Sequence, residues 1–344
     1  MIHIDPAVFQ VVTRPDGLHT ALQAAIRLEH ATLPPYLYAL YSLDADRNPA
    51  IAGIIASVAV EEMLHLSLAC NILNALGGTP SLDDPDFIPT YPGPLPGSIG
   101  DGLVVPLEPF SLALVKNVFM QIEEPEEPLE FPTTALAAAA PRTIGAFYRA
   151  IQQRIRAGGD ALFAPPPRNQ VTEGLPGLMA VTNAASAIAA IELIVEQGEG
   201  TATSPLDPEG DYAHYYRFAE IFHGRRLRPN PQAGPGTPPD QRFLYDGDPV
   251  PFDPDGVRPV PANPKAASYP PGSAARHACD TFNYTYTNLL KSLHATFNGQ
   301  PQSLRAAIGL MFSMRQQALD LMSGTNLGGT AVGPSFEYQP TLPS

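Results

Sequence analysis

The sequence predicts an all-α protein built around a four-helix bundle, with long Pro- and Gly-rich connections and two extra helices near the C-terminus. Apolar residues recur at helical spacing through long segments such as 18–43 and 50–76. Acidic and His side chains interrupt these apolar stripes at a few positions. The 40 prolines must be accommodated mainly between helices, which requires long ordered connections.

Turn residues bound the expected helices. The first, over 18–43, follows the capping residue Asp16, and we expect Pro34 and Pro35 to kink it because the apolar sequence continues beyond them. The second, over 50–76, ends at two consecutive glycines. Further helices are expected over 111–122, 143–156, 179–197, 211–226, 274–297 and 302–322.

This pattern predicts three regions. Residues 1–228 form the metal-binding bundle, 229–273 a Pro-rich connector with little regular structure, and 274–344 a helical hairpin packed on the bundle. The Gly-rich tail from Gly324 is expected to wrap back onto the body. The connection over 78–110 is too long for a simple bundle loop, so it should cover the surface or the site.

Composition excludes several classes of function. With 344 residues, 44% of them hydrophobic, the chain can bury a substantial core. A net charge of −14, with the 20 Lys and Arg scattered, argues against a nucleic-acid partner. Cys70 and Cys279 cannot build a disulfide framework. The longest apolar segment, 51–76, carries Glu62 and His65 near its centre, so we expect no membrane span and a cytoplasmic location.

The segment 51–76 also carries the main signal for a metal site. It has no Lys or Arg, yet Glu62 and His65 lie in its apolar stripe. Burying an unpaired carboxylate costs several kcal/mol, and a bound cation removes that cost. The Glu-x-x-His spacing places both side chains on one helical face. Four-helix bundles that bind two metal ions use this motif on two of their helices and a single Glu on each of the other two. Glu29, in the stripe of the first helix, suits a single-Glu position.

The later half of the bundle should supply another single Glu. Glu192 and Glu196 lie four residues apart in a segment that lacks basic residues. Glu196 is close to the end of its predicted helix, level with the start of the next helix in an antiparallel pair, where His214 lies. We therefore expect Glu196 to be a ligand, with Glu192 as a further candidate.

Two acid-x-x-His pairs compete for the last ligand position, Asp211 with His214 and Glu220 with His223. The two histidines are nine residues apart, about 180° around a helix, so only one of them can face the bundle core. The face of His214 continues through three apolar residues, Phe218, Ile221 and Phe222. This favours His214 and Asp211 as ligands and leaves Glu220 and His223 as the alternative.

Other acidic and aromatic residues are given ordinary roles. Glu61 lies about 100° from Glu62 around the helix, so we expect it behind the ligands or at the surface. Glu123 and Glu124 begin an acidic, Pro-rich stretch and are expected to be solvated. Tyr36 is expected to pack in the core or at the rim of the site.

Several of these segments resemble a known family. They are 28–37 (LEHATLPPYL), 60–66 (VEEMLHL), 194–200 (IVEQGEG) and 214–218 (HYYRF), together with 282–297 and the tail segment 333–338 (GPSFEY). They resemble the ferritin-like domain of the iminophenyl-pyruvate dimer synthase family, whose members include enzymes that couple two aromatic imino acids in pigment and indolocarbazole biosynthesis. The resemblance implies metal positions at Glu29, Glu62, His65, Glu196 and His214, and it includes Glu199 without assigning it a role.

Together these observations predict a non-haem di-iron protein with two Fe ions, or Mn in their place. We expect an oxygen-dependent oxidoreductase of secondary metabolism that acts on a small amino-acid-derived or aromatic substrate with dioxygen. By resemblance, the reaction is oxidative coupling of imino acids. Two alternatives stay open: a non-catalytic, iron-storage-like protein, and a haem-dependent coupling enzyme with one axial His. A homodimer is compatible with the sequence.

Overall fold

The computed structural model describes residues 11–12, 14, 17–96, 103–125, 128–129, 143–163, 165–207, 209–324 and 331–342. Within these residues the regular structure is helical apart from one two-stranded antiparallel sheet, which pairs β1 (Arg228–Pro229) with β2 (Phe243–Leu244). Short 3-10 helices punctuate the connections at Pro85–Phe87, Gly159–Leu162, Pro239–Gln241, Pro254–Gly256, Ala266–Ser268 and Pro301–Ser303. The all-α prediction is confirmed.

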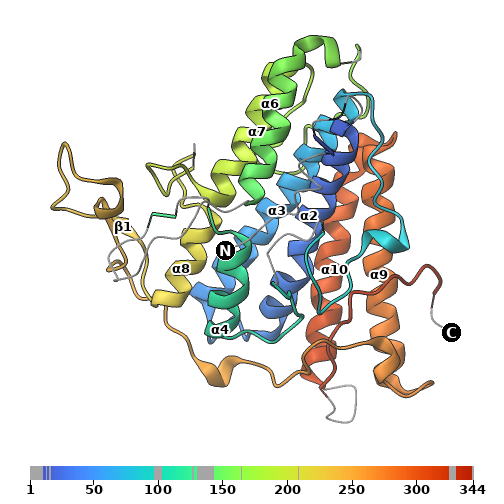
Figure 1. Ribbon diagram of the computed structural model, residues 1–344. Helices are drawn as coiled ribbons and strands as arrows, with labels where there is room; N and C mark the ends of the chain where they lie inside the picture. Colours follow the sequence, from blue (N-terminus) through green and yellow to red (C-terminus); the bar gives the residue numbers. More distant parts are fainter. Residues whose placement is uncertain are drawn as a thin grey trace.

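Four helices form the central bundle (Figure 1). They are α2 (Gly17–Ser42), α3 (Pro49–Ala75), α6 (Ile144–Gly158) and α7 (Ala184–Glu199). Helix α2 packs on α3, α3 on α7, α7 on α6, and α6 on α2, so the four helices enclose a common interior. The long α3 is apolar enough to cross a membrane by composition, but 72% of its most apolar window is buried within the protein.

The bundle differs from the prediction at its fourth position, which α6 occupies in place of the helix expected over 211–226. That helix, α8, is shorter, spanning His214–His223, and it packs across α3 and α7. The residues before it fold into a turn, where the Ala213 amide donates to the Pro205 carbonyl at 2.9 Å. Gly224 ends the helix in the left-handed conformation, with φ 68°. Ten residues are too few to run the length of the bundle.

Helix α2 continues through Pro34 and Pro35 without a break. Proline has no N–H, so Pro35 leaves the carbonyl of Ala31 without its helical donor. The buried hydroxyl of Tyr91 supplies a replacement, donating to the Ala31 oxygen at 2.7 Å. One helix can therefore present Glu29 and residues a turn or two later to the same interior.

The predicted helix over 111–122 forms as one segment with an irregular centre. It comprises α4 (Leu112–Leu114), a π-helical turn η2 (Val115–Phe119) and α5 (Met120–Ile122). A π-helical turn is wider than an α-turn, so it changes the direction in which the following residues point. The segment packs on α8, and Glu123 follows its last residue.

The last two helices, α9 (Ala274–Phe297) and α10 (Leu304–Ser323), form the expected hairpin, and α10 packs on α2. Their buried side chains belong to the same hydrophobic cluster as those of the bundle. The described tail residues, 331–342, lie along α9, where the Gln339 amide donates to the Thr287 hydroxyl at 2.7 Å. This segment therefore wraps back onto the body, as the sequence suggested.

Candidate metal centre

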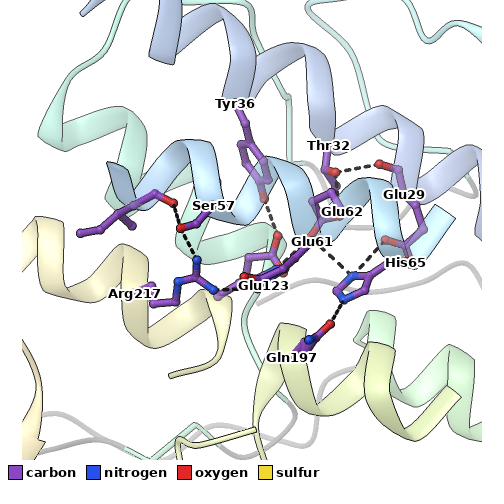
Figure 2. Close-up of polar contacts among 12 residues, drawn as sticks. Glu29, Thr32, Tyr36, Ser57, Glu61, Glu62, His65, Glu123, Gln197 and Arg217 are labelled. Atoms are coloured by element: carbon purple, nitrogen blue, oxygen red, sulfur yellow. Dashed lines mark hydrogen bonds and ion pairs between the residues drawn. The ribbon is translucent and has the colours of Figure 1, made fainter. Parts of the chain in front are cut away.

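Two helices bring the imidazoles of the site together. Glu62 and His65 lie on α3, and His214 is the first residue of α8. All three are buried, and one ligand atom from each lies within 4.8 Å of the others. The two imidazole rings are stacked, with centroids 5.3 Å apart. These three side chains form the core of the candidate site, part of which appears in Figure 2.

Three carboxylates face the two imidazoles. Oε1 of Glu62 lies 2.8 Å from Nδ1 of His214 and 3.7 Å from Nδ1 of His65. Glu29 adds an oxygen 3.8 Å from Nδ1 of His65, and Glu123 adds one 3.6 Å from Nδ1 of His214. Glu62 therefore lies between two half-sites, each with one imidazole and one further carboxylate.

The outer nitrogen of each imidazole is held from behind. Nε2 of His214 lies 2.8 Å from a carboxylate oxygen of Glu61, and Nε2 of His65 lies 3.0 Å from the amide oxygen of Gln197. Both acceptors require a proton on Nε2, so in the neutral imidazole, the form that binds a metal, the lone pair of each Nδ1 is directed inward. Nδ1 of His214 finds no hydrogen-bond partner among the described residues, although an oxygen of Glu62 is close. A cation between these atoms would satisfy both.

Each carboxylate is likewise anchored by a hydroxyl donor. The pairs are Tyr148 with Glu29 at 2.6 Å, Tyr36 with Glu123 at 2.5 Å and Thr32 with Glu62 at 2.9 Å. In every pair the donor binds one carboxylate oxygen, and the other oxygen faces an imidazole. One oxygen per carboxylate is therefore directed toward the interior, the arrangement that metal ligation requires.

A cavity of about 20 Å³ lies among these side chains, enough for a species the size of a water molecule. Glu199, in the last turn of α7, also lines it and is buried. Its carboxylate accepts a hydrogen bond from the Gly145 amide at 2.7 Å and lies 3.7 Å from the Arg149 guanidinium. A Cβ at position 145 would lie 2.2 Å from a Glu199 oxygen, so a larger residue there would displace the end of this side chain.

Burial and mutual repulsion set the charges of the metal-free site. Burial and the neighbouring Glu62 raise the pKa of both Glu29 and Glu123. Burial also opposes ionisation of Glu62, but contact with His214 outweighs it and lowers the pKa of Glu62. Burial lowers the pKa of His214, yet its carboxylate neighbours outweigh this effect and raise it strongly. In the metal-free protein, protons therefore occupy the place that cations would take.

The single Glu of α7 is not where the sequence placed it. Glu192 is exposed and pairs with Arg156 at 3.0 Å, and Glu196 is half-buried on the outer side of the helix. The prediction ended the helix at Gly198, whereas α7 continues to Glu199 and is capped by Gly200 with φ 73°. Glu199 lies about 60° around the helix from Glu196 and faces the cavity.

Asp211 does not join the site either. It is exposed and lies outside α8, which begins only at His214. The Asp-x-x-His spacing brings two side chains to one face only within a helix, and this stretch forms a turn instead. The acid beside His214 comes from Glu123, which was expected to be solvated but is 5% exposed.

A signal for Glu123 was present in the sequence. Val115, Phe119 and Ile122 precede it at helical spacing and are all buried. Glu123 continues this apolar stripe by one position. The acidic residues that follow it obscured the pattern.

The alternative pair, Glu220 and His223, lies apart from the cluster. Glu220 is buried and pairs with Arg226 at 2.6 Å, outside the metal cluster. The face of α8 that carries Glu220 is therefore covered, as is the face that carries His214. His223 stacks on Tyr245, with ring centroids 4.3 Å apart. Residues after the helix cover this second face, so its burial reflects packing of the connector.

Comparisons with known proteins agree with this geometry. The model of the ferritin-like family matches residues 22–223. The chain is 26% identical over 399 aligned positions to dichlorochromopyrrolate synthase of Lentzea aerocolonigenes, covering 95% of this chain and 36% of that enzyme. The chain thus spans only about a third of that relative's length. A solved ferritin-like protein of Caulobacter vibrioides shares the fold, with TM-score 0.60 and 24% identity over 92% of this chain and 96% of that one.

Substitution of the two histidines of α8 should have opposite outcomes. His214→Ala removes an inward Nδ1 and should lower metal affinity by about 10- to 100-fold or more. His223→Ala should leave it nearly unchanged, because His223 contacts Tyr245 outside the cluster. Anaerobic calorimetric titration of the metal-free protein with Mn²⁺ or Fe²⁺ measures both. Loss of affinity in the His223 variant alone would contradict the assignment.

Metal affinity should also depend on pH. The raised pKa values of Glu29, Glu123 and His214 keep protons on these groups at pH values where the isolated side chains would have lost them. Because metal must displace these protons, affinity should rise with pH, by roughly tenfold per unit for each proton released. Titrations in buffers of different ionisation enthalpy count the protons. Affinity that is constant between about pH 5.5 and 7.5 would be inconsistent with a site of this composition.

Proposed function

The chain belongs to the ferritin-like family, and from this premise we propose that it is a non-haem, two-metal, oxygen-dependent oxidoreductase acting on a small molecule. The observation that carries the proposal is the inward direction of both Nδ1 atoms. His65 and His214 each face Glu62 and one more carboxylate in a buried interior. A single ion would leave one of these two half-sites without a cation.

Carboxylate and imidazole ligands suit iron or manganese. Two iron ions bound here would supply the reduction of dioxygen and the oxidation of an adjacent organic molecule. Glu29 and His65 would hold one ion, and Glu123 and His214 the other. Glu62, which has one oxygen near both imidazoles, would contribute to holding either ion.

The surrounding side chains keep these ligands in position. Tyr148 and Tyr36 hold Glu29 and Glu123 by one oxygen each, which leaves the other directed inward. Such fixed donors reduce the reorganisation needed when ions bind. The interior is otherwise apolar and closely packed, which excludes bulk water from the ligands.

A pocket of about 260 Å³ on the outer side of α6 and α7 is the proposed substrate site. Val195 lines both this pocket and the cavity of the metal centre, so the two spaces share part of their wall. Arg149 on the pocket wall approaches Glu199 of the centre. Arginine favours a carboxylate, and the nearby Glu196 favours an amine or N–H group. The pocket therefore suits an amino-acid-derived substrate.

The curated relative supports a role in secondary metabolism. Its name describes a synthase of dichlorochromopyrrolate, and it resembles this chain over 95% of the chain's length. Oxidative coupling of aromatic imino acids is accordingly the first reaction to test. A haem is less suited to this position, because the cavity lined by Glu62, His65 and Glu123 has room for ions rather than a macrocycle.

The proposal predicts close to two iron ions per chain after iron-replete expression, with no Soret band in the optical spectrum. With dioxygen, the iron-loaded protein should convert aromatic imino acids, generated in place by an amino-acid oxidase, into oxidised or coupled products detectable by mass spectrometry. The metal-free protein is the control and should form none above background.

Metal content well below one ion per chain, or an intense Soret band, would overturn the two-metal assignment. Full iron content without substrate oxidation across a panel of aromatic amino acids would favour the storage-like alternative over the enzyme.

A further inference from the structure

The two halves of the centre have the same types of ligand on their inner side, although Glu62 lies 2.8 Å from Nδ1 of His214 and 3.7 Å from Nδ1 of His65. Each imidazole faces Glu62 and one additional carboxylate, and each of these carboxylates accepts a hydrogen bond from a buried tyrosine hydroxyl. The corresponding Nδ1 to carboxylate distances are 3.8 Å at His65 and 3.6 Å at His214. The chemical types of the groups differ between the half-sites behind the imidazoles.

Behind the imidazoles the two halves differ in charge. Nε2 of His214 donates to Glu61, a carboxylate that also forms an ion pair with Arg217 at 2.6 Å. Nε2 of His65 donates to Gln197, a neutral amide that is 4% exposed (Figure 2). An anionic acceptor is thus paired with one imidazole and a neutral acceptor with the other.

This difference changes the strength of the ligand atom. A hydrogen bond to a carboxylate draws the Nε2 proton outward and makes the opposite nitrogen a stronger donor to a metal. Arg217 lies 2.6 Å from the same Glu61 oxygen and weakens this effect without abolishing it, because the carboxylate remains the direct acceptor. An amide polarises the ring less.

We propose that the two metal positions are inequivalent: the position at His214, backed by Glu61, fills first and binds more tightly, while Gln197 keeps the position at His65 weaker. The proposal rests on the two-metal function proposed above. It assigns Glu61 and Gln197 as positioning residues that set the order of metal loading.

Glu199 does not remove this difference. It lines the common cavity, but its carboxylate oxygens already contact the Gly145 amide and the Arg149 guanidinium. Glu199 is thus paired within its own surroundings, and it is not the partner of either Nε2 atom. The direct partners of the two Nε2 atoms remain the clearest difference between the half-sites.

The test is an anaerobic calorimetric titration of the full-length, metal-free protein with Fe²⁺ alone. The wild type should bind in two steps whose affinities differ by about tenfold or more. Glu61→Gln gives His214 an amide acceptor like that of His65, so the tighter step should weaken and the two should converge. Gln197→Glu should make the affinities of the two steps more similar by strengthening the weaker step. The double variant should reverse the order of filling.

Assignment of the steps uses the histidines themselves. His65→Ala should abolish the weaker step and His214→Ala the tighter one in the wild-type background. Glu192→Gln is the matched control, because it makes the same change on an exposed carboxylate that pairs with Arg156, and both steps should stay unchanged. Circular dichroism of each metal-free variant verifies its fold.

Two equal steps in the wild type, or equal shifts of both steps in the Glu61 and Gln197 variants, would overturn the inequivalence alone. A wild-type protein that binds no Fe²⁺ would overturn the proposed function itself. A lower affinity of the tighter step alone in Glu61→Gln, together with a higher affinity of the weaker step alone in Gln197→Glu, would support the proposal even where thermal stability changes.

Discussion

The convergence of buried carboxylates on two imidazoles is the interaction on which the rest of the structure depends. Glu29, Glu62 and Glu123 come from different parts of the chain and are almost fully buried. An ionised carboxylate in such surroundings costs several kcal/mol unless a cation or hydrogen-bond donors compensate it. Protons and hydroxyl donors provide part of this compensation, and metal ions would provide the rest.

The fold can be understood as the scaffold that brings these groups together. Helices α2 and α3 supply Glu29, Glu62 and His65 from adjacent surfaces, and Tyr91 allows α2 to continue past its prolines. The short α8 contributes His214 from its first turn. Side chains on other elements hold one atom of each ligand group, so the directions of the inward atoms are determined before any ion binds.

The sequence predicts which side chains meet where both lie within one regular helix. Glu62 and His65 are three residues apart on α3, and helical geometry alone places them on one face. Glu29 was found in the same way. The prediction was wrong where the site depends on the end of a helix, as Glu196 and Asp211 illustrate. Glu199 lies beyond the apparent stop at Gly198, and His214 begins its helix.

Glu123 shows a second limit. Its burial follows from the packing of its segment on α8, a contact between residues far apart in the sequence that no local pattern specifies. The difference between the partners of His65 and His214 also depends on tertiary contacts over 132 and 153 residues of sequence separation. Local periodicity can place ligands on a helix, but their outer partners are set by the packed fold.

The most direct measurement is an anomalous difference map from crystals of the protein loaded with iron, collected at the iron absorption edge. The account predicts two strong peaks in the core, one near Nδ1 of His65 and one near Nδ1 of His214, with Glu62 between them. Peaks beside Glu192, Glu196 or Asp211, or no peak in the core of an iron-loaded crystal, would contradict it.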